Sequence, residues 1–159
     1  MPRAFQRVKA TRLKWRAAYP HVKDTAVALG VVLIVDDQEV IRQTVGTTLI
    51  KAGYDVLQAE DGRDAIHLLQ NDGNGDKIDT IICDLQMPNV GGSEAIRHFQ
   101  HHFPRIPVVV LTGAPDFVLT DVLRDQGVAD YLLKPVSSKR LLEVVRVTVR
   151  LHGLRRAQL

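Results

Sequence analysis

The chain has few of the features that would place it outside the cell or in a membrane. Cys83 is its single cysteine, so no disulfide can form within the chain, and a reducing compartment is the simplest expectation. No run reaches the roughly 18 to 20 apolar residues needed to cross a bilayer. The apolar stretch 26–35 follows a basic segment, as in a signal peptide, but it leads into Asp36 and Asp37 without a small-residue cleavage site. We therefore expect a soluble, cytoplasmic protein with no membrane span.

Charge is unevenly distributed along the 159 residues. Residues 1–30 contain seven Lys or Arg and one acid, a net of +6, whereas the rest contains 14 basic and 17 acidic residues, a net of −3. The basic end could contact an acidic partner or phosphates, but the acidic body gives no reason to expect direct DNA binding by the core. We expect a flexible or partly helical extension over 1–30, one folded domain over 31–152 and a tail over 153–159.

Short apolar runs alternate with segments of helical spacing, which is typical of repeated βα units around a parallel sheet. Five units are visible, so we expect an α/β fold with helices on both faces of a five-stranded sheet. The predicted strands cover 31–35, 54–59, 78–84, 107–112 and 129–133. The predicted helices cover about 40–50, 63–70, 93–103, 116–126 and 138–152, with Ser93 as the cap of the third.

Polar side chains stand where four of these strands end. Asp36 and Asp37 follow the first strand, and Asp84 ends the third. Thr112 ends the fourth, and Lys134 follows the fifth. The carboxyl ends of parallel strands lie at one edge of a sheet, where ligands bind. Three carboxylates in one pocket repel one another unless a divalent cation such as Mg²⁺ neutralises them, and one of them could then accept a phosphoryl group.

These positions resemble the motifs of the receiver domains of two-component response regulators, over about residues 31–152. The motifs are Val-Asp-Asp at 35–37, Asp-Leu-Gln-Met-Pro at 84–88 with Gly92, Leu-Thr-Gly at 111–113 and Lys-Pro at 134–135. The resemblance implies a flavodoxin-like, doubly wound fold with strand order 2-1-3-4-5. It also implies a phosphorelay that depends on Mg²⁺, or on Mn²⁺, with a histidine kinase or a histidine phosphotransfer protein as donor and a downstream protein as target.

The resemblance also implies roles for individual residues around the phosphoryl group. Asp84 is the expected phosphoacceptor, and Lys134 is expected to contact the phosphoryl group. The Lys134–Pro135 bond is expected to be cis. The implied metal ligands are Asp36, Asp37, Asp84 and the backbone carbonyl of Gln86.

The resemblance further implies that two residues form a conformational switch. Thr112 is expected to shift toward the aspartyl phosphate while Tyr131 turns inward, which alters a surface formed by the fourth helix, the fifth strand and the fifth helix. A homodimer could form through the same surface. Gln86 and Ala114 flank the phosphate in the family and tune how fast water removes it.

Each of these site residues, taken alone, could have a purely structural role. Asp36 or Asp37 could cap the helix that begins near Gln38, and Thr112 could merely end a strand. Tyr131 could be an ordinary half-buried strand aromatic. None of these explanations accounts for the coincidence of all the motifs in one order.

Other function classes fit less well. A pseudo-receiver that serves only as a binding scaffold would not need the full set of acidic, hydroxyl and lysine residues. A hydrolase with an aspartyl-phosphate intermediate usually has a second acid two residues after the nucleophile, and here that residue is Gln86. We therefore expect a signalling domain and not an enzyme. A stand-alone receiver acts through protein contacts, and a fragment of a longer regulator is the alternative.

Two further segments resemble metal sites, and one predicted helix has an unusually wide apolar surface. Residues 72–83 begin like a calcium loop but have Lys77 where that loop needs glycine, so a polar turn is expected. His98, His101 and His102 have helical spacing but no evident acid or cysteine partner, so surface histidines are expected. The helix over 138–152 is apolar on more than one stripe, and a partner subunit or the N-terminal extension could cover it.

Overall fold

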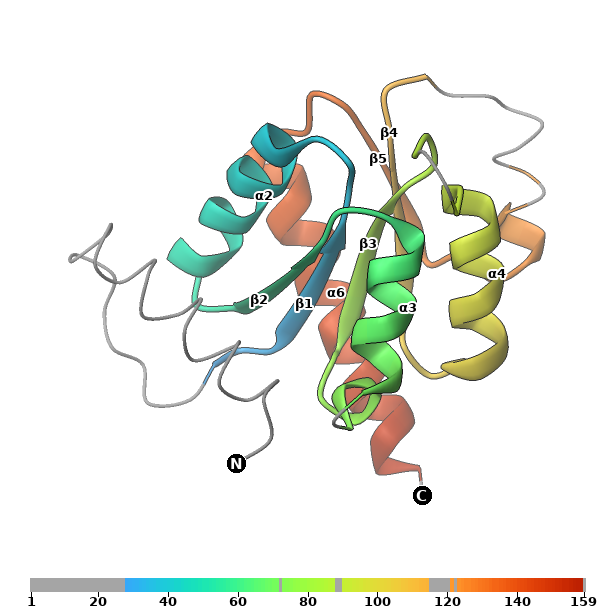
Figure 1. Cartoon of the computed structure of the whole chain (residues 1–159). Helices are drawn as coiled ribbons and strands as arrows, with labels where there is room; N and C mark the ends of the chain where they lie inside the picture. Colours follow the sequence, from blue (N-terminus) through green and yellow to red (C-terminus); the bar gives the residue numbers. More distant parts are fainter. Residues whose placement is uncertain (1–27, 72, 88–89, 115–120, 122, 159) are drawn as a thin grey trace.

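The structure is a computed structural model that describes residues 28–71, 73–87, 90–114, 121 and 123–158 (Figure 1). The predicted N-terminal extension lies outside the described residues except for its last three positions. Most of the predicted helix over 116–126 lies outside them as well. No helix in the described ranges is both long enough and apolar enough to span a bilayer.

Five strands form one parallel sheet in the order β2-β1-β3-β4-β5, which confirms the predicted fold class and strand order. The strands are β1 (Val31–Val35), β2 (Asp55–Ala59), β3 (Thr80–Asp84), β4 (Val108–Thr112) and β5 (Asp130–Leu133). The central strands β3 and β4 are buried along their whole length, as expected for apolar runs covered on both faces. In this register Val35 pairs with Cys83 and Asp84 pairs with Leu111, so the carboxyl ends of the strands meet at one edge.

Helices cover both faces of the sheet (Figure 1). They are α2 (Glu39–Lys51), α3 (Gly62–Gln70), α4 (Gly92–His102) and α6 (Ser138–Ala157), with a short 3₁₀ turn η1 (Asn74–Asp76). Alternate residues of β1 point to opposite sides: Leu33 packs with residues of α3 and α4, whereas Ile34 packs with residues of α2 and α6. Two apolar layers therefore hold β1 and β3 in the centre. Cys83 is fully buried in one of them, as predicted for a small hydrophobe.

Two local expectations are wrong. The helix expected to end near His152 continues to Ala157, so most of the expected tail 153–159 is helical. The segment after His152 contains no proline, and Gly153 stands within the helix without breaking it. The expected cap at Ser93 is replaced by an N-cap at Gly91 with no side-chain bond, because α4 already begins at Gly92.

Polar bonds fasten α6 to the amino-terminal edge of the sheet. The Asp79 carboxylate, just before β3, lies 2.9 Å from His152 Nδ1 and accepts a 2.8 Å bond from the Val31 backbone N–H. The Thr80 hydroxyl donates to the Thr148 hydroxyl over 3.0 Å. The buried face of α6 is thus fixed at the end of the sheet opposite to Asp84.

Candidate functional site

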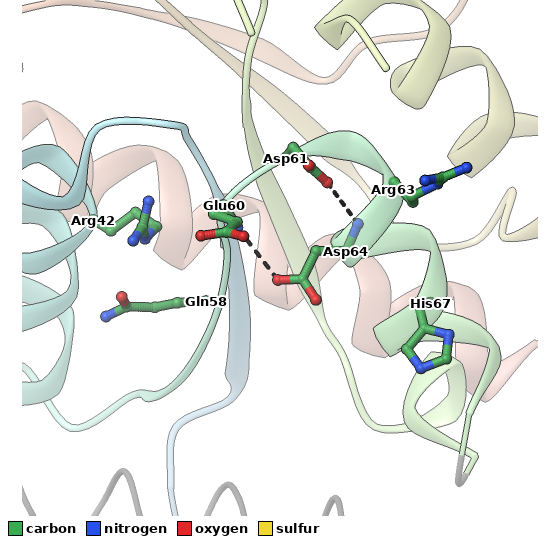
Figure 2. A pocket seen from close by; sticks show the side chains of 7 residues that line it. All are labelled: Arg42, Gln58, Glu60, Asp61, Arg63, Asp64 and His67. Carbon is green, nitrogen blue, oxygen red and sulfur yellow. Dashed lines mark hydrogen bonds between the residues drawn. The ribbon is translucent and has the colours of Figure 1, made fainter. Parts of the chain in front are cut away.

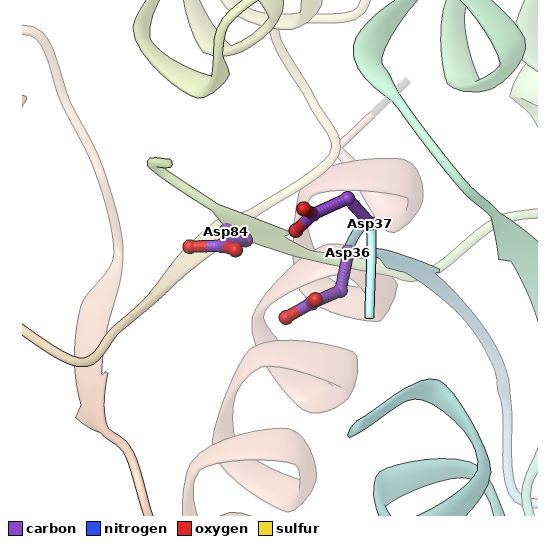
Figure 3. A group of neighbouring side chains, drawn as sticks. All are labelled: Asp36, Asp37 and Asp84. Carbon is purple, nitrogen blue, oxygen red and sulfur yellow. The ribbon is translucent and has the colours of Figure 1, made fainter. Parts of the chain in front are cut away.

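Three carboxylates meet at the carboxyl edge of the sheet (Figure 3). One oxygen each from Asp36, Asp37 and Asp84 lies within 4.8 Å of the other two. Asp36 is fully buried and Asp84 is 3% exposed, whereas Asp37 is exposed. Across the described ranges this is the only such group of three or more His, Cys, Asp or Glu side chains. The three histidines of α4 do not form one.

The backbone that follows β1 is held in place by several bonds. The Asp36 N–H donates to the Ala59 carbonyl of β2, and the Asp36 carboxylate accepts a 2.8 Å bond from the Gln38 N–H. Arg42 donates from Nη1 to the Asp36 carbonyl over 2.7 Å. The N-cap of α2 is Gln38, whose side chain makes no capping bond, so the explanation of Asp36 or Asp37 as the N-cap is wrong.

Lys134 joins two of the carboxylates. Its Nζ lies 2.7 Å from Asp36 Oδ2 and 3.1 Å from Asp84 Oδ2. Its backbone N–H donates to the Thr112 carbonyl, and the Lys134–Pro135 bond is cis, the isomer that the resemblance implied. The other Asp84 oxygen accepts a 3.1 Å bond from the Gln86 N–H.

The charges in this pocket do not balance. Burial raises the pKa of Asp84 above its ordinary value; the bonds from the Gln86 N–H and from Lys134 lower it in part, and the Asp36 charge raises it further. Burial alone lowers the pKa of Lys134, but the close contacts with the Asp36 and Asp84 carboxylates outweigh burial, so the net pKa is raised and the side chain remains an ammonium. One cation therefore faces three carboxylates.

This donor set fits a hard divalent cation. All three side chains offer carboxylate oxygens, which are the ligands that Mg²⁺ and Mn²⁺ prefer. The buried Asp36 Oδ2 has Lys134 as a charged neighbour but makes no well-aligned hydrogen bond. A cation beside it would relieve the excess negative charge.

Thr112 and the predicted tuning residues stand at or just after the ends of β3 and β4. The Thr112 side chain is buried, and its hydroxyl is 3.3 Å from the Ala114 N–H and 3.2 Å from the Ala114 carbonyl. Gln86 and Ala114 are exposed. Tyr131 is half-buried against the apolar layer under α3 and α4, and burial raises its pKa. A cavity of ≈ 570 Å³ over β5 is lined by both Thr112 and Tyr131.

Gly92, which the sequence analysis placed among the family motifs, has a packing role in the site that the sequence analysis did not predict. A Cβ added there would lie 2.0 Å from the Asp84 carbonyl oxygen and 2.5 Å from Leu85 Cα. Both atoms belong to the backbone and cannot rotate away. The local sequence does not show this role, since a close approach between backbones leaves no sign in it.

Arg42 was also missed, and it lines a second feature of the site. A polar groove of ≈ 730 Å³ lies beside the pocket, between α2 and the start of α3 (Figure 2). The Asp61 carboxylate caps α3 by accepting a 2.7 Å bond from the Asp64 N–H. The lining residues are Arg42, Gln58, Glu60, Asp61, Arg63, Asp64 and His67.

Comparison with known proteins gives consistent matches. Residues 32–146 match the model of the response regulator receiver domain. The chain is 33% identical over 121 residues to the CAI-1 autoinducer sensor kinase/phosphatase CqsS of Vibrio cholerae, covering 74% of this chain and 17% of that protein. It is 35% identical over 119 residues to the response regulator MprA of Mycolicibacterium vanbaalenii, covering 75% of this chain and 50% of that protein. The chain thus spans half or less of the length of these curated relatives.

Solved structures are similar over most of the chain. The Vibrio cholerae chemotaxis protein CheY4 matches with a TM-score of 0.69 and 32% identity, covering 76% of this chain and 99% of that one. A response regulator receiver protein from Pseudomonas putida matches with a TM-score of 0.70 and 30% identity, covering 76% of this chain and 98% of that one.

Proposed function

Because the chain belongs to the family of response regulator receiver domains, which act as phosphoacceptors in signalling, we propose that Asp84 is the residue that takes the phosphoryl group. The observation that carries this proposal is the position of its carboxylate. It ends β3, is nearly buried, lies 3.1 Å from the Lys134 ammonium, and has an oxygen within 4.8 Å of the two other acids. An Asp84 oxygen would attack phosphorus, forming a P–O bond as the bond from phosphorus to the donor breaks.

Asp36, Asp37, Asp84 and the backbone carbonyl of Gln86 are the proposed ligands of Mg²⁺ or Mn²⁺. When bound, this ion offsets negative charge on the phosphoryl oxygens. The chain supplies the rest of the positioning. Lys134 Nζ, 3.1 Å from Asp84 Oδ2, places a second positive charge beside the attacking carboxylate. The Gln86 N–H orients the other oxygen of that carboxylate. Gln86 and Ala114, exposed at the mouth, would set the access of water to the product.

Thr112 and Tyr131 are the proposed switch. The Thr112 hydroxyl makes two long hydrogen bonds with the backbone of Ala114, at 3.2 and 3.3 Å. A phosphoryl oxygen on Asp84 would be a stronger acceptor because it is charged. Movement of Thr112 would open space in the cavity that it shares with Tyr131, so the tyrosine could turn inward. The affected surface is β5, α6 and the segment 116–126, and a downstream protein would read it.

The phosphoryl donor is proposed to be a histidine kinase or a histidine phosphotransfer protein. The polar groove supports an approach from the side of α2 and α3 (Figure 2). Arg42 is part of this groove and also bonds to the Asp36 carbonyl. A donor seated there would therefore touch residues that hold the acidic pocket in shape.

Intact mass after incubation with acetyl phosphate and Mg²⁺ tests the proposal. We expect one added phosphoryl group on the wild-type chain, none on Asp84→Asn, and none without a divalent ion. Asp76→Asn removes an exposed acid of η1, away from the pocket and the switch surface, and serves as the matched control, which should be phosphorylated normally. Phosphorylation of Asp84→Asn to the wild-type extent would contradict the assignment.

A further inference from the structure

Arg42 holds the peptide that joins two of the proposed metal ligands. Its guanidinium donates from Nη1 to the Asp36 carbonyl over 2.7 Å, and this carbonyl belongs to the peptide unit between Asp36 and Asp37. Within the described ranges no backbone N–H donates to it, because the first bonded N–H groups of α2, those of Ile41 and Arg42, donate to the Gln38 carbonyl instead. The orientation of this peptide is therefore set by a side chain and not by secondary structure.

The two acids that this peptide joins are held in different ways. Asp36 is fully buried, its N–H donates to the Ala59 carbonyl, and its carboxylate accepts a bond from the Gln38 N–H. Asp37 is exposed, and its side chain makes no hydrogen bond or ion pair with any residue that the structure describes. The place of Asp37 is therefore set by the backbone that Arg42 holds.

The position of Arg42 in α2 is not explained by the stability of the helix. Arg42 is the fourth residue of α2, near the positive end of the helix dipole, where an acid would be more favourable than a base. Its side chain is half-buried in the wall of the polar groove, on the side of α2 (Figure 2). The guanidinium is planar and always charged, so it holds an acceptor in a more defined direction than the flexible ammonium of a lysine does.

Positioning and charge make opposite predictions for the effect of Arg42 on a bound cation. Mg²⁺ requires a nearly octahedral set of ligands, and loss of a group that orients such ligands commonly weakens metal binding about ten- to a hundredfold. By charge alone, removal of a guanidinium beside three carboxylates would leave the pocket more negative and would strengthen the binding of a cation. The sign of the change therefore distinguishes the two roles.

We propose that Arg42 is a positioning residue of the phosphorylation site. Its bond to the Asp36 carbonyl orients the Asp36–Asp37 peptide and holds both carboxylates in the arrangement that Mg²⁺ or Mn²⁺ requires. This inference rests on the proposed function, because it assumes the same metal ligands. Arg42 acts on the affinity for the ion and not on the phosphoryl group itself.

Mn²⁺ binding, followed by electron paramagnetic resonance of the free ion, tests the inference without phosphorylation. We expect Arg42→Ala to raise the dissociation constant about tenfold. Arg42→Lys keeps the positive charge on a shorter and more flexible side chain, and it should raise the dissociation constant as well. Arg97→Ala removes an exposed arginine of α4 outside the pocket, and this matched control should bind Mn²⁺ as the wild type does. Circular dichroism verifies that every variant is folded.

Phosphorylation by acetyl phosphate at varied Mg²⁺ gives a second readout. The Mg²⁺ concentration for half of the maximal rate should rise about tenfold in Arg42→Ala, whereas the rate at saturating Mg²⁺ should stay within about twofold of that of the wild type. A role in helix stability alone would lower the melting temperature and leave both values unchanged.

Three outcomes would overturn the inference. Unchanged or tighter Mn²⁺ binding by Arg42→Ala, with binding still weakened in Asp84→Asn, would overturn it and leave the proposed function intact. A slower rate at saturating Mg²⁺ with unchanged metal affinity would assign Arg42 to the phosphoryl group instead. Absence of Mn²⁺ binding by the wild-type chain would overturn both the inference and the proposed metal site.

Discussion

Asp84 is placed where its negative charge is costly to the folded chain. Its carboxylate is nearly buried beside Asp36, and the single ammonium of Lys134 is shared between the two. Exposed Asp37 adds a third negative charge. A cost of this kind is common at functional sites, where stability is sacrificed for reactivity. Removal of one negative charge should therefore stabilise the fold.

Asp84→Asn should raise the melting temperature in metal-free buffer at neutral pH by about 3 °C, or roughly 1 kcal/mol for a chain of this size. The amide keeps the shape of the side chain, and Lys134 then pairs with Asp36 alone. Thermal unfolding followed by circular dichroism measures the difference. Mg²⁺ should raise the melting temperature of the wild type more than that of the variant, because only the wild type retains three carboxylates.

The same comparison has a defined dependence on pH. Burial raises the pKa of Asp84, so the folded state binds a proton more tightly than the unfolded state does. The cost of the charged carboxylate is full at neutral pH and fades as the pH falls through the folded-state pKa. The advantage of Asp84→Asn should therefore shrink between about pH 7 and about pH 4. An advantage that grows on acidification would contradict this account.

At the scale of elements, the connection between β3 and α4 decides where Asp84 points. The Gly92 N–H donates to the Leu85 carbonyl, so the first residue of α4 folds back on the end of β3. This return leaves no room for a Cβ at Gly92. The neighbouring Gly91 has no atom within 4 Å of an added Cβ. Two adjacent glycines in the sequence thus have different roles in the structure.

Gly92→Ala should destabilise the chain by roughly 2–3 kcal/mol, because the new methyl group collides with backbone atoms of Asp84 and Leu85. It should also slow phosphorylation by acetyl phosphate in the fraction that stays folded. Urea unfolding and intact mass measure the two effects. The adjacent Gly91→Ala should cost less than about 1 kcal/mol, since only its preference as an N-cap is lost. Equal costs for the two variants would be inconsistent with the close approach at Gly92.

At the scale of the whole molecule, the two edges of the sheet have different roles. The acidic pocket and the polar groove share the carboxyl edge, whereas the bonds of Asp79 and Thr80 that fasten α6 lie at the opposite edge. If the proposed docking is right, a small donor needs only the pocket, whereas a protein donor must also fit the groove.

Glu60→Lys should slow phosphorylation by a protein donor without affecting phosphorylation by a small donor. Its side chain is exposed and lines the groove, so reversal of its charge changes the surface without altering the pocket (Figure 2). We expect transfer from a histidine kinase or phosphotransfer protein that phosphorylates the wild type to slow about tenfold. Phosphorylation by acetyl phosphate should be unchanged. Glu143→Lys on α6 is the matched control, and a normal transfer rate in Glu60→Lys would remove the groove from the docking surface.

Much of the site could be predicted from local sequence. Apolar runs end at Asp36, Asp84 and Thr112, and a parallel sheet brings the carboxyl ends of its strands to one edge. The order of the motifs identified the receiver family, and the match over residues 32–146 confirms that identification. The roles of individual residues in phosphorylation and switching stay predictions.

What the sequence determined by itself was the pattern of strands and helices and the residues at their ends, because these depend on neighbours along the chain. Only the tertiary structure decided which atoms meet. The bonds of Lys134 to two aspartates, the crowding at Gly92 and the bond from Arg42 join segments that come together through sheet register and packing. The length of α6 was decided in the same way, since contacts to Asp79 hold His152 within a helix that then continues to Ala157.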